Sequence, residues 1–437
     1  FVQTSAAESN EILHAFVPVA GMGQPVNGNS SGPRLANVEI KGPTVAQGVS
    51  ETASRRQIFT CYPKSAAQEA PCAHQILASV ARRAFRRPIT DEDLKGAMSF
   101  YAQGRKNGGD FDTGIQKGLL AILVSPKFLF RMHEPPPDAL PGKPFRINDI
   151  DLASRLSFFL WAGPPDEELI KVAAAGRLHE QPVLDAQVRR MLKDPRAHSL
   201  VTDFAFEWLN IHGLELVNPD TNLFPDFTHD LESAFEKEME LFVGNVFASD
   251  SSVVDLLTSN RTYLNERLAL HYHIPNIRGG EFRAVTVPDY RRGLLGKGAV
   301  LMATSYANRT TVVLRGVFVL DKLLGAPPSA PPPGIPSFME SADGVDQLTV
   351  RARMEMHRSQ PSCNACHAII DPIGMAMENF NALGQWRDKD IDADTPIDAK
   401  GKLADGTPIN GINDLRNYLV GHAPQFVQIY KYNLMSY

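Results

Sequence analysis

Cys363, Cys366 and His367 form a Cys-x-x-Cys-His motif, which is the spacing at which a chain covalently captures a haem. Each thiol adds to one vinyl group of the porphyrin, and the histidine binds the iron from the proximal side. Random placement of 4 Cys and 12 His in 437 residues gives on the order of 0.001 such motifs, so chance explains it poorly. A redox dithiol needs a βαβ setting and a zinc site needs further close ligands, and neither is visible. The motif therefore predicts one covalently bound haem c.

The sixth position of the iron decides what such a haem does. A His or Met ligand there favours electron transfer, whereas an open position allows peroxide or dioxygen chemistry. His357 precedes His367 on a predicted helix, and Met435 lies in an apolar C-terminal helix. An open or water-filled position is the third alternative, and the residues do not decide among the three. Further candidates, for which packing in the core is the simpler interpretation, are Met375, Met377 and His271.

Trp386 and Arg387 follow the motif and suit a haem propionate. A guanidinium matches a carboxylate bidentately, and an indole N–H can donate a hydrogen bond to one. The alternative for this pair is a packed turn. We expect Asp371-Pro372 and Gly374 to shape the chain where it leaves the attachment helix.

An acidic run follows, in which alternate residues carry oxygen ligands of the kind that calcium binds. Its members are Asp388, Asp390, Asp392, Asp394 and Asp398. The glycine and the bidentate glutamate of an EF-hand are absent, so a solvated acidic turn is the simpler interpretation and calcium the lesser one. The chain has no nucleophile elbow, phosphate-binding glycine loop or His-Glu-x-x-His motif. No other catalytic residues are predicted, and whether the chain is a haem-dependent oxidoreductase stays open.

The other two cysteines indicate the compartment. Cys61 and Cys72 flank a loop short enough to close as a local disulfide, with two reduced core cysteines as the alternative. Covalent haem attachment also belongs outside the cytoplasm, so both features predict a bacterial periplasmic or extracellular protein. The chain begins at Phe1 without a leader pattern, and we expect any signal peptide to have been removed.

Composition excludes two classes of partner. The formal net charge of −5 and the mixed signs argue against nucleic acid, which requires a basic face. No window approaches the roughly 18 uninterrupted apolar residues of a membrane span, so none is predicted.

Patterning along the chain predicts a mainly α, multi-domain protein. In order, the segments are a β-like N-terminus that resembles the tail of a larger β module (1–56), a helical domain with the Cys61–Cys72 disulfide (57–135), a helical middle domain (136–326), a Pro-rich linker (327–345) and a small c-type haem domain (346–437). Thr90 is expected to cap a helix whose first turn is acidic. Other helical segments are 115–123, 149–160, 166–174, 182–192, 197–209, 230–247, 350–358, 413–420 and one from 424.

The motif and its surroundings resemble a large group of secreted bacterial proteins, abundant in Planctomycetes, built of consecutive domains of unknown function associated with a Planctomycete-type cytochrome c. After the motif the resemblance rests on Asp371-Pro372-Ile373-Gly374, Glu378-Asn379-Phe380, Gly384 and Trp386-Arg387. Earlier stretches similar to motifs of the group are Ser54–Phe59, Ala84–Pro88, Ser125–Arg131, Ser154–Trp161, Leu264–Arg267, His271-Tyr272, Arg292–Leu295, Thr304–Tyr306 and Arg309-Thr310. Asn381 and Thr311-Val312-Val313 depart from the usual Asp and Ser-Pro-Val. Many relatives carry an upstream haem domain, which implies a redox partner and makes a separate cytochrome c chain one candidate.

Three functions remain. The first is electron transfer with a redox partner, supported by a single haem motif without another catalytic motif. The second is a haem enzyme of the peroxidase or oxygenase kind, supported by more helical protein than a carrier needs. The third is a secreted binding or assembly module with a structural haem, supported by the β-like N-terminus.

Overall fold

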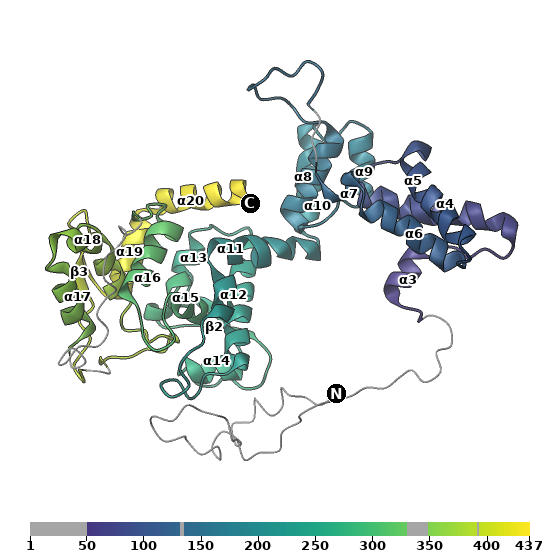
Figure 1. The fold of residues 1–437 in the computed structure, drawn as a ribbon. Helices are drawn as coiled ribbons and strands as arrows, with labels where there is room; N and C mark the ends of the chain where they lie inside the picture. Colours follow the sequence, from purple (N-terminus) through teal and green to yellow (C-terminus); the bar gives the residue numbers. More distant parts are fainter. Residues whose placement is uncertain (1–49, 132–134, 330–347, 391–392) are drawn as a thin grey trace, which may run out of the picture. The chain divides into compact units, whose positions relative to one another are not determined.

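The computed structural model describes residues 50–131, 135–329, 348–390 and 393–437. The chain divides into two compact units, one that ends at Ser199 and one that runs from Leu200 to Tyr437 (Figure 1). Nearly all the regular structure in the described residues is helical, with two small sheets, which confirms the mainly α prediction. Most of the predicted β-like N-terminus (1–49) and of the Pro-rich linker (330–345) lies outside the described residues.

The unit that ends at Ser199 contains only helices among its described residues. They are α3 (Ala53–Ile58), α4 (Ala66–Ala84), α5 (Asp91–Lys106), α6 (Phe111–Leu123), α7 (Pro126–Leu129), α8 (Asp149–Trp161), α9 (Glu167–Ala174), α10 (Gln181–Leu192) and the 3₁₀ helix η1 (Pro195–His198). Thr90 caps α5 as predicted, in a capping box with Asp93. Ile76, Leu77 and Ala81 of α4 lie on its buried face and pack with α5 and α6 in one core.

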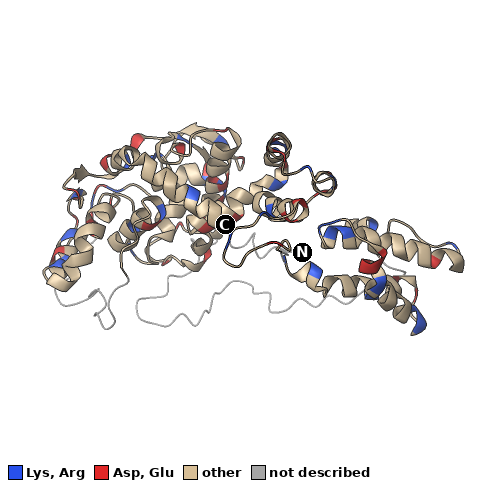
Figure 2. Cartoon of the chain, turned by 90° about the horizontal axis from the view of Figure 1, so that it is seen from above, with Lys and Arg blue, Asp and Glu red and all other residues tan. Residues whose placement is uncertain are grey.

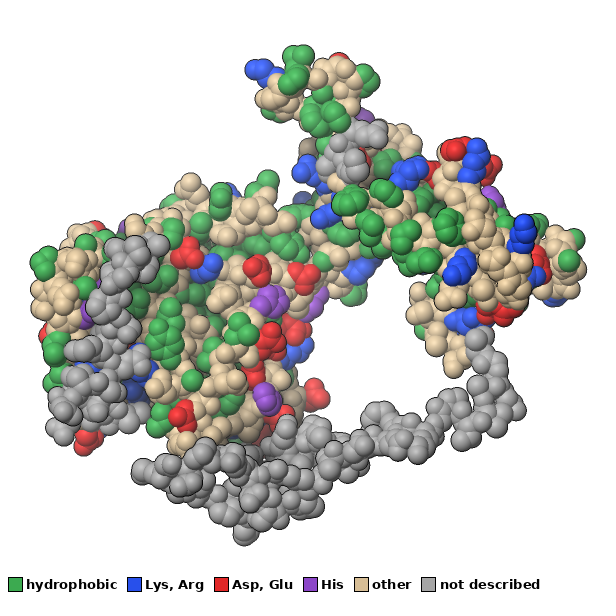
Figure 3. All heavy atoms as spheres, viewed as in Figure 1, with side chains coloured by type: hydrophobic (Ala, Val, Ile, Leu, Met, Phe, Trp, Pro, Cys, Tyr) green, Lys and Arg blue, Asp and Glu red, His purple; other side chains and the backbone are tan. Residues whose placement is uncertain are grey.

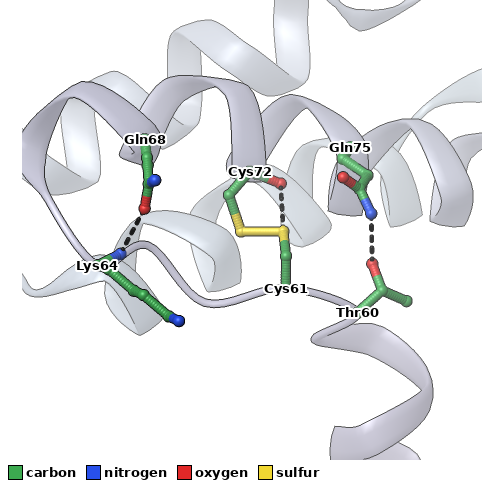
Figure 4. The surroundings of a disulfide bond; sticks show 6 residues. All are labelled: Thr60, Cys61, Lys64, Gln68, Cys72 and Gln75. Carbon is green, nitrogen blue, oxygen red and sulfur yellow. Dashed lines mark hydrogen bonds between the residues drawn. A yellow bond between two sulfur atoms is a disulfide. The ribbon is translucent and has the colours of Figure 1, made fainter.

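The Cys61–Cys72 disulfide is present in this unit (Figure 4), with an S–S distance of 2.05 Å. It joins the loop after α3 to the buried side of α4. The same loop is held by two hydrogen bonds to α4, from Lys64 N to Gln68 Oε1 at 2.9 Å and from Gln75 Nε2 to Thr60 Oγ1 at 3.5 Å. The bridge therefore fixes the segment that leads into the first long helix.

The surface of this unit carries apolar side chains on α6 and α7 (Figure 3). The exposed ones there include Leu120, Leu123, Val124, Leu129 and Phe130. Positive and negative side chains both occur along the helices of each unit (Figure 2). No helix among the described residues combines the length and the apolar character needed to cross a membrane.

The unit from Leu200 to Tyr437 combines helices with two antiparallel two-stranded sheets. Its elements are η2 (Leu200–Ala205, π), α11 (Phe206–Trp208), η3 (Ile211–Leu216), α12 (His229–Ala248), α13 (Asp255–Thr258), β1 (Arg261–Leu264), α14 (Glu266–His271), β2 (Arg283–Thr286), η4 (Asp289–Arg291), η5 (Leu294–Gly296), α15 (Gly298–Ala303), α16 (Val312–Phe318), η6 (Val319–Leu323, π), α17 (Val350–Arg358), α18 (Pro361–Met375), β3 (Lys400–Lys402), β4 (Pro408–Asn410), α19 (Ile412–Gly421) and α20 (Ala423–Ser436). The sheets pair β1 with β2 and β3 with β4.

One continuous apolar core runs through this unit. Phe235, Met239 and Phe242 of α12 enter it at helical spacing, and the core extends to Ile373 of α18 and Phe426 of α20. The segment that carries the haem motif is therefore packed within the same unit as the helices from Leu200 onward.

A buried polar group lies inside this core. The Glu238 carboxylate accepts hydrogen bonds from Tyr272 (2.6 Å) and Thr262 (2.5 Å), and Lys297 Nζ lies 3.6 Å away. Burial lowers the pKa of Lys297 to about 8. Tyr272 also accepts a hydrogen bond from the backbone of Gly298, so these side chains hold α12, α14 and α15 in register.

The sequence predicted one continuous α-helix over 197–209, and this prediction is wrong. The structure breaks it into the 3₁₀ helix η1, the π helix η2 and the short helix α11. Trp208 of α11 donates a hydrogen bond from its indole to the Lys322 carbonyl 114 residues away, so tertiary contacts fix this stretch.

Candidate functional site

The three motif residues lie on the first turns of α18, which begins at Pro361. Proline suits the first turn of a helix because its missing N–H would have no partner there. Cys363, Cys366 and His367 stand at positions i, i+3 and i+4, so they share one face. Cys363 is buried, Cys366 is half-buried against the core, and both are free thiols. Two thiols and an imidazole on one helical face are the donor set that a covalently held haem requires.

A buried carboxylate fixes the orientation of His367. Its Nδ1 lies 2.9 Å from Oδ1 of Asp371, one turn further along α18, and the Asp371 side chain is 2 % exposed. A carboxylate only accepts hydrogen bonds, so Nδ1 carries the proton and Nε2 is left to bind a metal. Arg358 at the end of α17 places its Nε 3.6 Å from the other oxygen, Oδ2. The residues present therefore fit the proximal side of a haem.

Asp371 is the functional residue that the sequence interpretation missed. We expected Asp371-Pro372 and Gly374 to lead the chain out of the attachment helix, but α18 continues through Pro372 to Met375. A residue before proline normally avoids helical backbone angles, which is why the sequence suggested an end here. The signal available was the i, i+4 spacing of His367 and Asp371, at which two side chains meet on a helix.

His357 of α17 lies beside the motif. Its imidazole packs edge to face on that of His367, with ring centroids 4.6 Å apart and an interplanar angle of 73°. Partial burial and the neighbouring His367 lower the pKa of His357. Two imidazoles on opposite sides of one metal have centroids about 6 Å apart, given metal–nitrogen distances of about 2 Å. Ligation by both rings would thus require α17 to move away from α18.

The other candidate ligands lie elsewhere. Met435 is 83 % exposed near the C-terminal end of α20, and this end points away from α17 and α18 (Figure 1). Met375 is buried with Val312 and Met354, and Met377 is buried in the main core. His271 donates a hydrogen bond from Nε2 to the Leu383 carbonyl at 2.8 Å, and burial lowers its pKa to about 4.

Trp386 and Arg387, the predicted propionate ligands, have protein partners in this structure. The Trp386 indole N–H donates to Asp388 at 2.9 Å, and its ring packs on Tyr290. The Arg387 guanidinium forms an ion pair with the buried Glu378 and reaches Thr310. Their role toward a propionate remains a prediction.

The described members of the acidic run also have partners. Asp390 is buried and accepts from the backbone N–H of Val350 at 3.1 Å. Asp394 pairs with Lys389, and Asp398 pairs with Arg351. Asp392 lies outside the described residues. Within the part of the chain that the structure covers, no three acidic, His or Cys side chains gather as a metal site.

A set of buried cationic and imidazole side chains holds the loop after α18, and we call it the carbonyl clamp. It consists of Arg315, Arg291 and His271. Arg315 donates to the carbonyls of Met377, Phe380 and Asn381, each at 2.8 Å, and Arg291 donates to that of Gly384 at 2.7 Å. Burial lowers the pKa of Arg315 to about 10, so it stays charged at neutral pH.

Helices α16 and α18 cross at two glycines. A Cβ on Gly374 would overlap the carbonyl oxygen of Val312, and a Cβ on Gly316 would overlap that of Ile370. The two backbones therefore touch, and the crossing fixes the far end of the motif helix.

A cavity of about 190 Å³ lies beside α18. Its charged lining comes from α17, α18 and β3, and consists of Arg351, Arg358, Asp371, Lys400 and Lys402. The cavity borders the carboxylate that orients His367.

Comparison with known families adds the wider context. Residues 72–133 match the model PSD5, residues 147–274 match PSD4 and residues 291–390 match PSCyt3; these are described as proteins of unknown function, DUF1595, DUF1592 and DUF1588. No curated protein and no solved structure matches the chain. The third match contains the whole Cys-x-x-Cys-His motif together with Asp371 and Arg387. These three consecutive domains are the architecture of the Planctomycete cytochrome-associated proteins, and the chain belongs to that group.

Proposed function

We propose that this chain is a c-type haem protein of the periplasm or cell exterior that exchanges electrons with a redox partner. The observation that carries the proposal is the shared face of α18, on which two free thiols stand beside an imidazole whose Nδ1 is held by a buried carboxylate. The PSCyt3 name of the matched family agrees with it. Haem bound there supplies a centre that gains and loses one electron.

The residues of this chain would do three things. The Cys363 and Cys366 sulfurs each form a bond to a vinyl carbon while their protons pass to the neighbouring vinyl carbons, so attachment consumes no oxidant. His367 presents Nε2, and Asp371 keeps its ring in that orientation. The core contacts of Ile370 and Ile373 hold the helix that carries all four residues.

Electron transfer is favoured over an enzyme because the chain carries one haem motif and no second catalytic motif. The Cys61–Cys72 disulfide supports an oxidising compartment.

Expression with a haem-attachment system tests the proposal. We expect the purified chain to gain the mass of one haem and a visible Soret band, and the double variant Cys363→Ser/Cys366→Ser to lose both. The matched control is Cys61→Ser/Cys72→Ser, which removes the other two sulfurs and should keep the haem. A wild-type mass equal to that of the bare polypeptide would contradict the proposal.

Partner exchange is tested separately. The reduced protein, mixed with a ferric soluble cytochrome c in a stopped-flow instrument, should be oxidised. If the haem instead binds carbon monoxide readily and reacts with peroxide but not with the cytochrome, the enzyme alternative replaces electron transfer.

A further inference from the structure

We propose that Asp371 is a positioning residue that, balanced by Arg358, sets the reduction potential of the haem held by His367; this rests on the haem attachment proposed above. Asp371 contacts His367 at Nδ1, not at the Nε2 that would bind the iron. It would therefore act on the haem through the imidazole ring. Nothing in the family matches assigns a role to it or to Arg358.

The two oxygens of Asp371 face different surroundings. Oδ1 lies 2.9 Å from His367 Nδ1, whereas Oδ2 lies 3.6 Å from Arg358 Nε and accepts no hydrogen bond from the described protein atoms. Of these two polar neighbours, the imidazole is the closer to the carboxylate. A buried carboxylate that has few donors forms a strong hydrogen bond with the donor that it does have. We therefore expect a strong hydrogen bond between His367 Nδ1–H and Asp371.

The cavity beside α18 is bordered by this carboxylate and by four cationic side chains. Arg351, Arg358, Lys400 and Lys402 line it together with Asp371. Arg351 is engaged elsewhere, since its Nε lies 3.0 Å from the Asp398 carboxylate. Arg358 is thus the cation that balances Asp371 most directly, without reaching hydrogen-bonding distance.

The chemical consequence follows from how a histidine ligand responds to its second nitrogen. A carboxylate that accepts the Nδ1 proton raises the basicity of Nε2. A more basic ligand stabilises the oxidised metal over the reduced one, so the potential falls. An amide at the same position is neutral and accepts more weakly, whereas loss of Arg358 leaves the carboxylate a stronger acceptor.

The experiment measures midpoint potentials of haem-loaded variants by spectroelectrochemistry. In Asp371→Asn we expect the ratio of reduced to oxidised haem at a fixed electrode potential to rise about tenfold, which is about 59 mV for one electron. Arg358→Gln should shift the potential in the opposite direction. The matched control is Asp398→Asn, which removes the same charge from the partner of Arg351 and should change the potential much less.

Proton NMR spectra of the haem-loaded variants separate the hydrogen bond from a simple charge effect. The resonance of the His367 Nδ1–H proton should shift in Asp371→Asn, which weakens its acceptor, and stay in place in Asp398→Asn. If Asp371→Asn does not fold, Arg358→Gln still tests the proposal through the sign of its potential shift. Equal potential shifts in Asp371→Asn and Asp398→Asn, or an unmoved Nδ1–H resonance, would overturn it.

The mass of each preparation is measured first. A chain without haem defeats the proposed function and this inference together, whereas a haem-loaded chain whose potential ignores Asp371 defeats only this inference.

Discussion

Arg315 is a single buried side chain that holds the loop following the motif helix. It is fully buried, and its guanidinium donates to three carbonyls of the loop after α18. Removing it leaves those three carbonyls without this donor and takes away a positive charge 3.9 Å from the buried Glu378 carboxylate. We expect Arg315→Gln to lower the free energy of unfolding by about 3–5 kcal/mol, measured by denaturant titration.

The matched control for that variant is Arg278→Gln, because Arg278 is 78 % exposed and pairs only at the surface with Glu266. It should cost less than about 1 kcal/mol. Equal costs for the two variants would contradict a special role for Arg315.

His271 makes the stability depend on pH. Burial lowers its pKa from the ordinary 6.5 to about 4, although the Leu383 carbonyl partly opposes this. Between these values the unfolded chain binds a proton at His271 and the folded chain does not, so acidification favours unfolding. The stabilisation is fully present above pH 6.5, and about 2 kcal/mol of it is lost at pH 5.

The measurement compares unfolding free energies at pH 7.5 and pH 5 for the wild type and His271→Gln. Glutamine keeps a donor for the Leu383 carbonyl but does not titrate, so the variant should lose about 2 kcal/mol less on acidification. An identical pH dependence in both proteins would refute this assignment.

At the scale of single residues, sequence predicted the motif but not its supporting contacts. Cys363, Cys366 and His367 are adjacent in the chain and carry their chemistry in their spacing. The contact of Asp371 with His367 was not predicted, because the proline after Asp371 suggested that the helix ended there. Arg291 stands in no motif named above, yet it donates to the Gly384 carbonyl 93 residues away. No local pattern encodes such a pairing.

At the scale of elements, α16 and α18 cross so closely that their backbones leave no room for a side chain at the crossing. Gly374→Ala would force the two helices apart, because its Cβ overlaps the Val312 carbonyl. We expect a loss of about 3 kcal/mol in unfolding free energy. Gly421→Ala at the end of α19, where a Cβ meets nothing within 4 Å, should change stability by less than about 1 kcal/mol. A neutral Gly374→Ala would show that the helices can separate.

Helices α17 and α20 carry the two predicted distal ligands, and their packing distinguishes them. The His357 ring contacts that of His367, whereas Met435 is exposed on α20. We expect His357→Ala to change the visible spectrum of the haem-loaded protein and Met435→Ala to leave it unchanged. Wild-type spectra from both variants would remove both residues as ligands.

Helix bounds were predictable where the apolar repeat is regular. Helix α17 has the predicted bounds Val350–Arg358, and α9 and α10 agree within one residue. The stretch 197–209 failed because its breaks depend on distant partners such as the Lys322 carbonyl. Periodicity reports only the face that a helix buries.

At the scale of the whole molecule, the Cys61–Cys72 bridge belongs to one of the two units only. The loop it closes is short, and its removal should cost about 3 kcal/mol. In Cys61→Ser/Cys72→Ser we expect faster hydrogen exchange in α3 to α6 and unchanged exchange in α12 to α18, measured by mass spectrometry. Faster exchange in the second set alone would contradict this location of the effect.

The grouping of elements into units was beyond the sequence. The boundary at Ser199 and Leu200 falls inside the predicted middle domain, at a point without a proline or glycine cluster. Contacts over long separations, such as Arg315 with Met377, decide which helices share a core. A single sequence does not list those pairs.

The carbonyl clamp also bears on how electrons would travel. Because Arg315, Arg291 and His271 hold the loop that follows α18 by hydrogen bonds, a haem on this helix would stay fixed within its unit and would not move between an electron donor and an acceptor. Electron transfer would then require a separate partner protein to bind, and its rate would be proportional to the concentration of each protein and set by their diffusional encounter.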